Sequence, residues 1–407
     1  MGHRAARQER NGVLRLLSLE LLFADEVCAG LLSDEKLLAA MARFEAALAR
    51  ASARHGLVPA AHAEVIVRVC ETARFDTSQL ARAGRAGTLA IPFVKQLTAQ
   101  VAAASKEAAA HVHAGATSQD VIDTAAVLCL KAACSRVDEL TVRLGNAAGE
   151  LARRHSHTPT AARTLLQPAL AVPFGWKAAV WLSMLARSLG GVRSAAASAC
   201  VLQFGGPSGT LASLGDKGEG VLTELARELE LPPSLVPWHS ARDGFARLGA
   251  ELAILAGAAG KIGRDISLLM QRELGEAAEP AAEGRGGSSS MPHKRNPALS
   301  MIALEAAQRA PGLAATLLGQ LTPEHERGLG QWQSQWFTLR ELLCASSSGV
   351  AAMADALEGL EIDGNAMRTN LESLLPGQPR DAFGAAGAMI EAALGQWAEA
   401  TSRGTAP

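Results

Sequence analysis

Residues 286–297 read GGSSSMPHKRNP, a run of small, polar and cationic side chains that cannot bury apolar surface. Its glycines and prolines also exclude a helix interior. Successive N–H groups after Gly287 can form an anion-binding nest, to which Lys294 adds a charge and Asn296 an amide. A serine in such a nest can be deprotonated, because the same donors stabilise its alkoxide. We therefore predict that this segment binds a carboxylate and removes the proton beside it; a flexible Gly/Ser linker is the alternative.

The same stretch resembles the GSSxMPxKxNP signature of the fumarase/aspartase superfamily, a highly specific pattern matched by residues 287–297. The resemblance implies a homotetramer with a helical core, in which three subunits build each active site. It also implies that Ser288 is the general base that takes a proton α to a carboxylate. Ser289, Lys294 and Asn296 are then expected to bind the substrate.

The segment HAGATSQD at 113–120 is similar to the superfamily motif HxGxTSxD. The resemblance implies that Thr117 and Ser118 contact a substrate carboxylate. It makes His113 the candidate acid/base partner of the reaction. The alternative for His113 is a buried structural histidine, which is the common role of an isolated histidine.

The segment RTLLQPA at 163–169 is similar to the motif RTHxQxA, which implies substrate contacts from Thr164 and Gln167. Here the sequence departs from the lyases, because Leu165 stands where the motif has its histidine. Met301 stands about where many lyases carry the glutamate that holds this histidine. A carboxylate with no histidine to orient would be a buried charge without a use. We therefore expect no His–Glu pair of the kind found in fumarases and argininosuccinate lyases.

This departure resembles one branch of the superfamily, the bacterial 3-carboxy-cis,cis-muconate cycloisomerases. The segments LQFGGPSGTLASLG at 202–215, PWHSARD at 237–243 and EHERGLGQW at 324–332 are similar to that branch. The resemblance implies lactonization of 3-carboxy-cis,cis-muconate by carboxylate addition and α-proton transfer, in the β-ketoadipate pathway of aromatic catabolism. Arg242 and Arg327 lie in these segments and are expected to bind further substrate carboxylates. A surface ion pair is the alternative for each arginine.

Several positions differ from what the branch usually shows. Ala114 replaces a common tryptophan, Thr88-Leu89 replace Asn-Pro, and Gly244 stands where a second arginine is usual. The missing arginine matters most, because a tricarboxylate needs cationic partners. The alternative function is a β-elimination lyase that releases fumarate from a substituted succinate of the nitrosuccinate, adenylosuccinate or argininosuccinate type. A catalytically silent helical scaffold is a third possibility, and the intact signature argues against it.

Long helices are expected to position these motifs. Alanine and leucine dominate, aromatic residues make up 4%, and β-branched runs of period two are hard to find, which is typical of an all-α protein. Helical patterns run at about 120–155, 174–200, 246–275, 298–320 and 334–358. We expect a fumarase/aspartase-like (L-aspartase-like) bundle with a tetrameric core. Its parts are an N-terminal helical domain at 1–110, the central bundle at 111–358 and a shortened C-terminal segment at 359–407.

Packing expectations follow from the helix at about 246–275. Its apolar residues step alternately by four and three, which is a heptad seam that requires a partner helix: Leu248, Leu252, Leu255, Ala259, Ile262, Ile266 and Leu269. Gly249, Gly257, Gly260 and Gly263 are expected to let neighbouring helices approach closely. Wide apolar faces such as AVLCLKAAC at 126–134 are expected to be covered in a homo-oligomer.

The totals limit the remaining function classes. A net charge of −1 over 407 residues gives no basic excess for nucleic acid or an anionic membrane. The six cysteines form no CxxC pair and no zinc-like cluster, so we expect no metal or cofactor and a reducing cytoplasm. No apolar run is long enough to predict a membrane span. The expected partner is a small di- or tricarboxylate.

Overall fold

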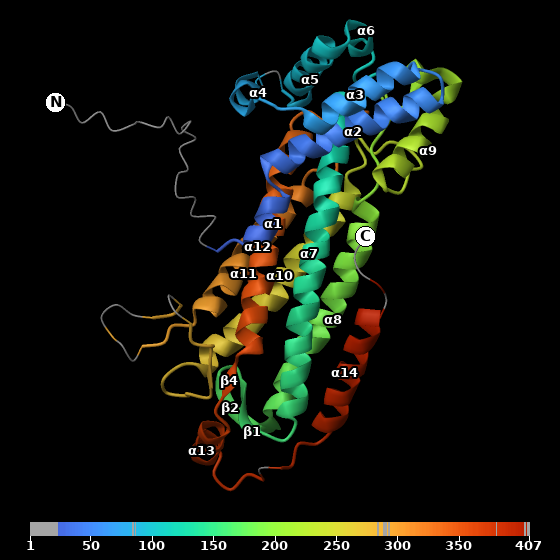
Figure 1. Cartoon of the computed structure of the whole chain (residues 1–407). Helices are drawn as coiled ribbons and strands as arrows, with labels where there is room; N and C mark the ends of the chain where they lie inside the picture. The colour runs from blue at the N-terminus through green and yellow to red at the C-terminus, as the bar shows by residue number, and fades with distance from the viewer. Residues whose placement is uncertain are drawn as a thin grey trace, which may run out of the picture.

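The computed structural model describes residues 23–402 and 404, except residues 84, 86, 283, 284, 288–290, 292, 293 and 380. Long helices form an elongated bundle at its centre (Figure 1). They are α7 (Ser118–Arg154), α8 (Phe174–Ala199), α10 (Asp243–Leu269), α11 (Ala298–Leu318) and α12 (Gln331–Glu358). All five predicted long helices are confirmed. The longest, α7, has 37 residues and spans about 55 Å at 1.5 Å per residue.

The seam of α10 forms the middle of the bundle, where this helix packs against α8, α11 and α12. Every apolar residue predicted for the seam is buried. A Cβ on Gly260 would meet the Ala307 Cβ of α11 at 2.3 Å, so the two helices approach closely there, as expected. Gly257 differs, since nothing lies within 4 Å of its would-be Cβ. This glycine is exposed and is not needed for packing within the chain.

Short helices gather at one end of the bundle, at the top of Figure 1. The helix α2 crosses the start of α7 and packs against α3 and α9. The elements at this end are α2 (Asp34–Arg54), α3 (Ala60–Thr72), α4 (Thr77–Ala83), α5 (Ala90–Ala104), α6 (Lys106–Ala109), the 3₁₀ helix η3 (Ala212–Lys217) and α9 (Gly218–Leu229). The short helix α1 (Glu26–Leu31) lies instead along the bundle against α7 and α12 (Figure 1). Since α9 comes from the middle of the chain, this end combines segments that are distant in sequence.

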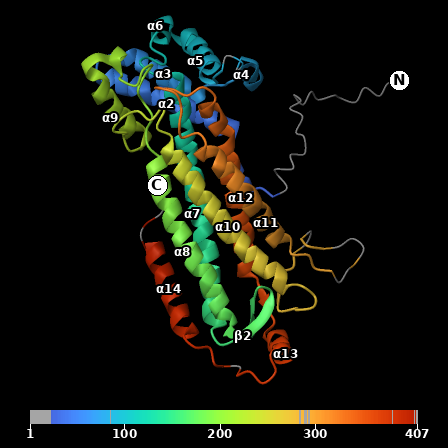
Figure 2. The ribbon, with the colours of Figure 1, turned by 180° about the vertical axis from the view of Figure 1, so that it is seen from behind.

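The opposite end carries an antiparallel hairpin and a further pair of short antiparallel strands, which the sequence did not predict. The strands β1 (Pro159–Thr164) and β2 (Gln167–Pro173) pair in a register that sets Thr164 opposite Gln167. Two-residue strands β3 (Ala277–Ala278) and β4 (Glu361–Ile362) pair beside them. The helix α13 (Gly364–Leu374) packs on β1, and α14 (Ala386–Ser402) returns along α8 and α7, as Figure 2 shows from behind. The fold is still all-α, as predicted.

The exposed apolar residues are not where the sequence placed them. Most of residues 126–134 is buried or half-buried within the chain, because α2, α8 and α12 cover α7. Exposed apolar side chains lie instead on the outer faces of other bundle helices: Ile254 on α10, Met301 and Leu318 on α11, and Phe337 on α12. In the described part of the chain, no helix is long and apolar enough to span a membrane. The domain boundaries at 110/111 and 358/359 stay a prediction.

Candidate active site

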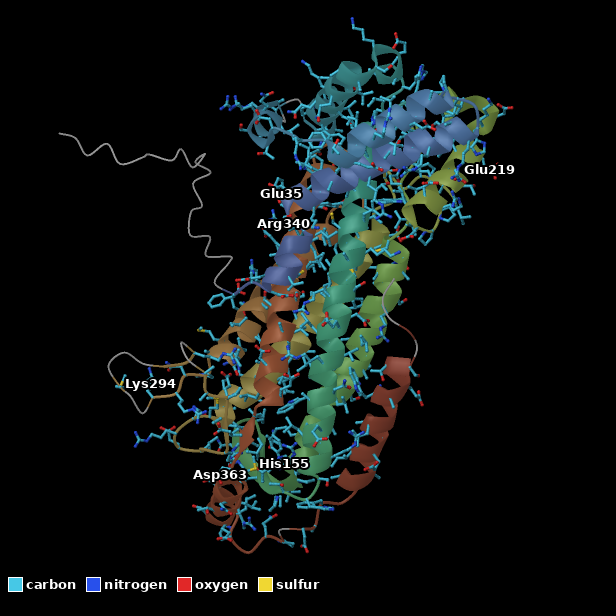
Figure 3. The ribbon with its side chains drawn as sticks, viewed as in Figure 1. Glu35, His155, Glu219, Lys294, Arg340 and Asp363 are labelled. Atoms are coloured by element: carbon cyan, nitrogen blue, oxygen red, sulfur yellow. The ribbon has the colours of Figure 1, made fainter. Side chains whose placement is uncertain are left out.

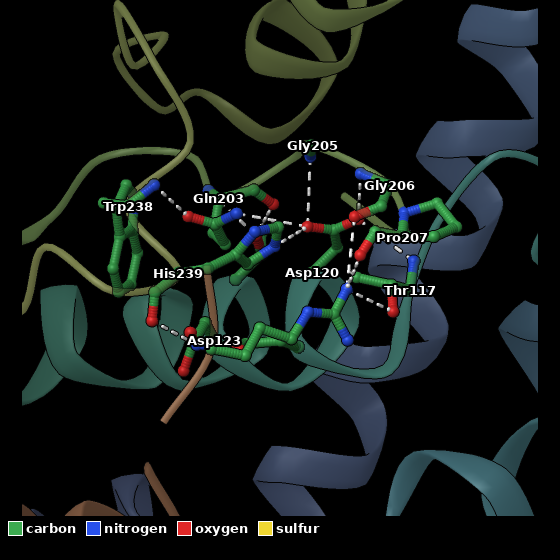
Figure 4. A network of polar contacts seen from close by, with 12 residues as sticks. Thr117, Asp120, Asp123, Gln203, Gly205, Gly206, Pro207, Trp238 and His239 are labelled. Carbon is green, nitrogen blue, oxygen red and sulfur yellow. Dashed lines mark hydrogen bonds and ion pairs between the residues drawn. The ribbon is translucent and has the colours of Figure 1, made fainter. Parts of the chain in front are cut away.

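The motif at 113–120 forms a tight turn that leads into α7, and Asp120 organises it. The Thr117 N–H donates to Asp120 Oδ2 at 3.0 Å, which caps the first turn of the helix. Three further donors to the buried Asp120 carboxylate come from the 203–206 segment (Figure 4). They are the N–H groups of Gly205 at 3.0 Å and Gly206 at 2.9 Å and the Gln203 side chain at 3.1 Å. This carboxylate therefore joins two predicted motifs and fixes the position of Thr117.

His239 of the PWHSARD segment is part of the same network. Its Nε2 lies 2.7 Å from Asp120 Oδ1, and its carbonyl accepts from the Gln119 side chain at 2.8 Å. The ring is buried, and Figure 4 shows it between Gln203 and Asp120. These two contacts connect the PWHSARD segment to the first turn of α7.

His113 forms a pair with Glu45 from the middle of α2. The His113 Nδ1 and Glu45 Oε1 atoms are 2.6 Å apart, and Glu45 Oε2 is buried without a hydrogen-bond partner. Burial acts to lower the pKa of His113, but the Glu45 carboxylate outweighs it, with a further contribution from Asp120, so the pKa lies above its ordinary value. The backbone of His113 has a positive φ of 61°, an uncommon conformation for a residue with a side chain. The turn thus holds His113 in a protonatable pair, the arrangement required of an acid/base group.

Arg327 joins the turn from the segment before α12. Its Nη2 donates to Thr117 Oγ1 at 2.8 Å and to the carbonyl oxygens of Gly206 at 3.2 Å and Pro207 at 2.8 Å. Its Nε is buried with no hydrogen-bond partner. The structure therefore brings three predicted site residues, His113, Thr117 and Arg327, to one end of α7, where Ser118 is the first residue of the helix.

Arg242 is placed differently from its predicted role. Its guanidinium is buried and binds Asp123, with Nη1 at 2.7 Å from Oδ2 and Nη2 at 3.2 Å from Oδ1. It also donates to the Gln335 side chain at 2.5 and 2.8 Å and stacks on Trp238, 4.7 Å from the ring centre. The carboxylate that Arg242 contacts is therefore one of the chain's own. It also lines a largely apolar cavity of about 440 Å³ between α2, α4, α7 and α12.

Thr164 and Gln167 are exposed at the tip of the β1–β2 hairpin. The two residues between them, Leu165 and Leu166, both have positive φ, at 51° and 66°. A two-residue turn with positive φ at both positions matches the right-handed twist of the strands, but it normally uses asparagine and glycine. Leu165, which stands where the motif has its histidine, is 97% exposed at this tip.

The signature loop leaves the bundle between β3 and α11. Ser288 and Ser289 lie outside the described residues. Lys294 is exposed and Asn296 is half-buried, and both line a cavity of about 270 Å³ with Glu279 and Arg285. Figure 3 shows Lys294 on a loop that projects from the side of the bundle.

The predicted site residues fall into groups that one chain does not bring together. Thr117 begins α7 at the end next to α2, whereas Thr164 follows the far end of this helix, about 55 Å away along its length. The Lys294 loop lies beyond the C-terminal end of α10, away from Thr117 (Figures 1 and 3). No group of three or more His, Cys, Asp or Glu side chains in the described ranges is placed to hold a metal ion.

Glu45 and the role of Asp120 were not found from the sequence. Asp120 was part of the motif at 113–120. Its place at the centre of the network depends on Gln203 and His239, which lie 83 and 119 residues away in the sequence. Glu45 did leave one signal. It is a charge inside the apolar run FEAALA of α2, on the face that carries the buried Phe44 and Leu48. A buried carboxylate needs a partner, so a charge at this position indicates a polar contact but not the residue that makes it.

Comparisons with known proteins identify the family to which the chain belongs. The family described as "Lyase" matches residues 26–312. A 3-carboxy-cis,cis-muconate cycloisomerase of Bradyrhizobium diazoefficiens is 51% identical over 341 residues, which cover 84% of this chain and 76% of that protein. A nitrosuccinate lyase of Streptomyces davaonensis is 41% identical over 350 residues, 84% of this chain and 73% of that protein. The crystal structure of 3-carboxy-cis,cis-muconate lactonizing enzyme from Pseudomonas putida superposes with a TM-score of 0.88 at 34% identity, covering 94% of this chain and 99% of that one.

A bundle of long helices, with the TSQD turn at one end and the β1–β2 hairpin at the other, is therefore the fold of a family of lyase enzymes. The chain belongs to the lyase family of the fumarase/aspartase superfamily.

Proposed function

We propose that this enzyme is a cycloisomerase that lactonizes 3-carboxy-cis,cis-muconate to 4-carboxymuconolactone. Four curated relatives of that name, at 40–51% identity, support the proposal. The proposed setting is aromatic catabolism in the cytoplasm, and the six cysteines, all free thiols, fit a reducing compartment.

The observation that carries the proposal is the environment of Leu165. It stands fully exposed at the hairpin tip in place of a histidine, and Met301, in place of the glutamate, is exposed on α11. An elimination that relies on a His–Glu pair to protonate a leaving group lacks both partners here. Lactonization has no leaving group to protonate, because a carboxylate of the substrate adds to the substrate's own double bond.

In the proposed mechanism, one substrate carboxylate oxygen attacks the conjugated double bond and forms the C–O bond of the lactone. The electron pair moves towards the neighbouring carboxylate and gives an aci-carboxylate dianion. The Ser288 hydroxyl then delivers its proton to the α-carbon and recovers one from solvent. The tether between nucleophile and alkene makes the addition intramolecular, which supplies the required proximity.

Stabilisation of the dianion is the main task of the surrounding groups. Lys294 supplies a positive charge and Asn296 an amide. Ser289 supplies hydrogen-bond donors from the signature loop. Thr117 and Ser118 offer hydroxyls at the N-terminus of α7, where the helix dipole favours an anion. Thr164 and Gln167 present polar groups from the hairpin tip, and Arg327 fixes Thr117. His113, whose pKa is raised by Glu45, lies in the same turn as a proton donor or acceptor.

The separation of these groups supports a homotetramer with shared sites. Lys294, Thr164 and Thr117 cannot meet in one chain, but antiparallel bundles from different subunits would bring the two ends together. The exposed apolar faces of α10, α11 and α12 supply surface for such contacts.

The alternative is a β-elimination lyase that releases fumarate from a substituted succinate. This alternative needs fewer cationic side chains for its substrate than lactonization of a tricarboxylate does. Arg242 is already paired with Asp123, and Gly244 provides no second arginine. A Cβ on Gly244 would lie 3.3 Å from the Ser198 carbonyl oxygen of α8, so close packing of α8 on α10 accounts for the glycine.

An absorbance assay with 3-carboxy-cis,cis-muconate tests the proposal. Loss of the conjugated diene with formation of a lactone, abolished in Ser288→Ala, is the expected result. A folded enzyme that leaves the diene intact but releases fumarate from substituted succinates would establish the alternative. Turnover by Ser288→Ala at the wild-type rate would remove Ser288 from the mechanism.

A further inference from the structure

The start of α11 lacks a cap of its own. The first N–H groups of a helix have no partner within the helix and are usually satisfied by a side chain at the N-cap. The N-cap here is Pro297, the last residue of the signature, and proline has no side-chain acceptor. The helix therefore needs an acceptor from elsewhere in the chain.

Glu279 supplies that acceptor from the other side of the loop. Its Oε2 accepts the Leu299 N–H at 2.9 Å, and its Oε1 accepts the Ser300 N–H at 2.7 Å and the Ser300 hydroxyl at 2.6 Å. Glu279 is only 4% exposed, and both residues that donate to it are buried. A carboxylate at a helix N-terminus is also favoured by the helix dipole.

The main chain of Glu279 makes a second contact with the signature loop. Its carbonyl accepts from Arg295 Nη2 at 2.6 Å. Next to this contact, the Asn296 N–H donates to the Gly286 carbonyl at 2.8 Å. Gly286 has a φ of 67°, and a Cβ there would meet the Asn296 carbonyl oxygen at 2.6 Å. The base of the loop is thus closed by short contacts between residues on either side of it.

Glu279 and Ser300, which form the cap of α11, are both connected to the bundle. Ser300 packs on α10, where its carbonyl oxygen would lie 3.1 Å from a Cβ on Gly263. Glu279 follows β3, which pairs with β4. The positions of Lys294 and Asn296 relative to the rigid helices are therefore set through Glu279.

We propose that Glu279 is a positioning residue of the active site, which holds the Lys294–Asn296 stretch in place by capping α11 with its carboxylate and binding Arg295 with its carbonyl. The catalytic part of this inference rests on the proposed function, because it takes Lys294 and Asn296 as substrate-binding residues. The structural part does not.

Glu279→Gln is the first test, since it preserves size but replaces one acceptor oxygen by a donor that cannot accept from an N–H group. We expect kcat to fall by about 10- to 100-fold, the effect of a displacement of about 1 Å in catalytic groups. The matched control is Glu361→Gln, which removes an exposed carboxylate that also contacts Arg295 at 3.3 Å. Its expected effect is less than about twofold. Equal kcat values for Glu279→Gln and wild type would overturn the proposal.

Amide hydrogen exchange of the full chain gives a readout that does not depend on catalysis. In Glu279→Gln, exchange at residues 294–301 is expected to be about tenfold faster, which corresponds to the loss of one hydrogen bond to a charged group. Exchange in α7 and α8 should match wild type. Unchanged exchange at 294–301, or a uniform increase over the whole bundle, would overturn the positioning role.

The two failures are distinguishable. A wild-type protein without cycloisomerase activity contradicts the proposed function, while the exchange result still decides the role of Glu279. If Glu279→Gln does not fold, Ser300→Ala replaces it, because this variant removes only the hydroxyl bond to Glu279. A smaller but local increase in exchange at 294–301 is then expected, and no local change would contradict the proposal.

Discussion

Glu45 Oε1 lies 2.6 Å from His113 Nδ1, so a carboxylate buried in α2 favours the protonated form of a histidine in the turn before α7. The contact joins residues 68 positions apart in the sequence. It leaves the other ring nitrogen of His113 as the atom that can exchange a proton with a ligand. The histidine is thereby held in one orientation, and its pKa is raised above the ordinary value.

Glu45→Gln is expected to lower the pKa of His113, because the opposite charge that favours the imidazolium is lost. The limb of the pH–rate profile that reports His113 should move down by about 1 unit or more. Glu35→Gln is the matched control, since Glu35 is an exposed glutamate of the same helix. An unchanged limb in Glu45→Gln would exclude His113 from the titration that controls the rate.

The same pair predicts a pH dependence of stability. The pKa of His113 is raised in the folded state, so the pair contributes fully below the ordinary histidine pKa of about 6.5. The contribution is lost as the pH rises through the raised pKa. The difference in thermal midpoint between wild type and Glu45→Gln should therefore shrink from pH 6 to pH 9. A difference that grows over this range would contradict the assignment.

Asp123→Asn tests whether Arg242 is structural. Removing one partner of a buried ion pair costs about 3–5 kcal/mol of unfolding free energy. Asp355→Asn, in a part-exposed pair with Arg143 at 2.7 Å, should cost about 1 kcal/mol or less. Denaturation curves at equal protein concentration measure both changes. Wild-type stability of Asp123→Asn together with an altered KM would instead make Arg242 a substrate-binding residue.

Two glycines of α10 give opposite predictions. Gly260→Ala places a Cβ against Ala307 and should destabilise the protein by about 1–3 kcal/mol. Gly257→Ala meets no atom and should stabilise the helix by about 0.4–1 kcal/mol. Thermal unfolding of the two variants side by side checks the pair. Similar shifts would mean that helix propensity, not close packing, governs both positions.

Subunit mixing tests the shared site. Ser288→Ala and His113→Ala chains, each inactive alone, should recover activity when refolded together, because some sites then combine a wild-type residue from each chain. Each variant refolded separately is the control. Mixed oligomers without any recovered activity would show that both residues act from the same chain.

The long helices could be predicted because their apolar periodicity is local. The seam runs from Leu248 to Leu269 within the 27-residue helix α10 and can be recognised without knowledge of its neighbours. The β1–β2 hairpin could not be predicted in the same way. Its strands are short, and it is held by the buried Glu276, whose carboxylate binds Arg163 at 2.7 and 3.0 Å and Asn370 at 2.8 Å. These partners are about a hundred residues away.

In the candidate site, too, local sequence motifs could be recognised but contacts between distant residues could not. Motifs predicted Thr117, Lys294 and Asn296 as site residues, because each belongs to a contiguous segment with a recognisable composition. Arg242 was interpreted as a carboxylate-binding residue, and it does bind one, but the carboxylate is that of Asp123, 119 residues earlier. Pairings of this kind arise from the fold, so the sequence indicates a charged residue without identifying its partner.

The most direct measurement of the central claim is the reaction of the purified enzyme with 3-carboxy-cis,cis-muconate in D₂O, followed by NMR and mass analysis of the product. Carboxylate addition with α-proton transfer predicts a lactone that carries one solvent-derived deuterium on the carbon next to a carboxylate, and no product from Ser288→Ala. A folded wild-type enzyme that forms no deuterated lactone, and instead releases fumarate from a substituted succinate, would contradict the account.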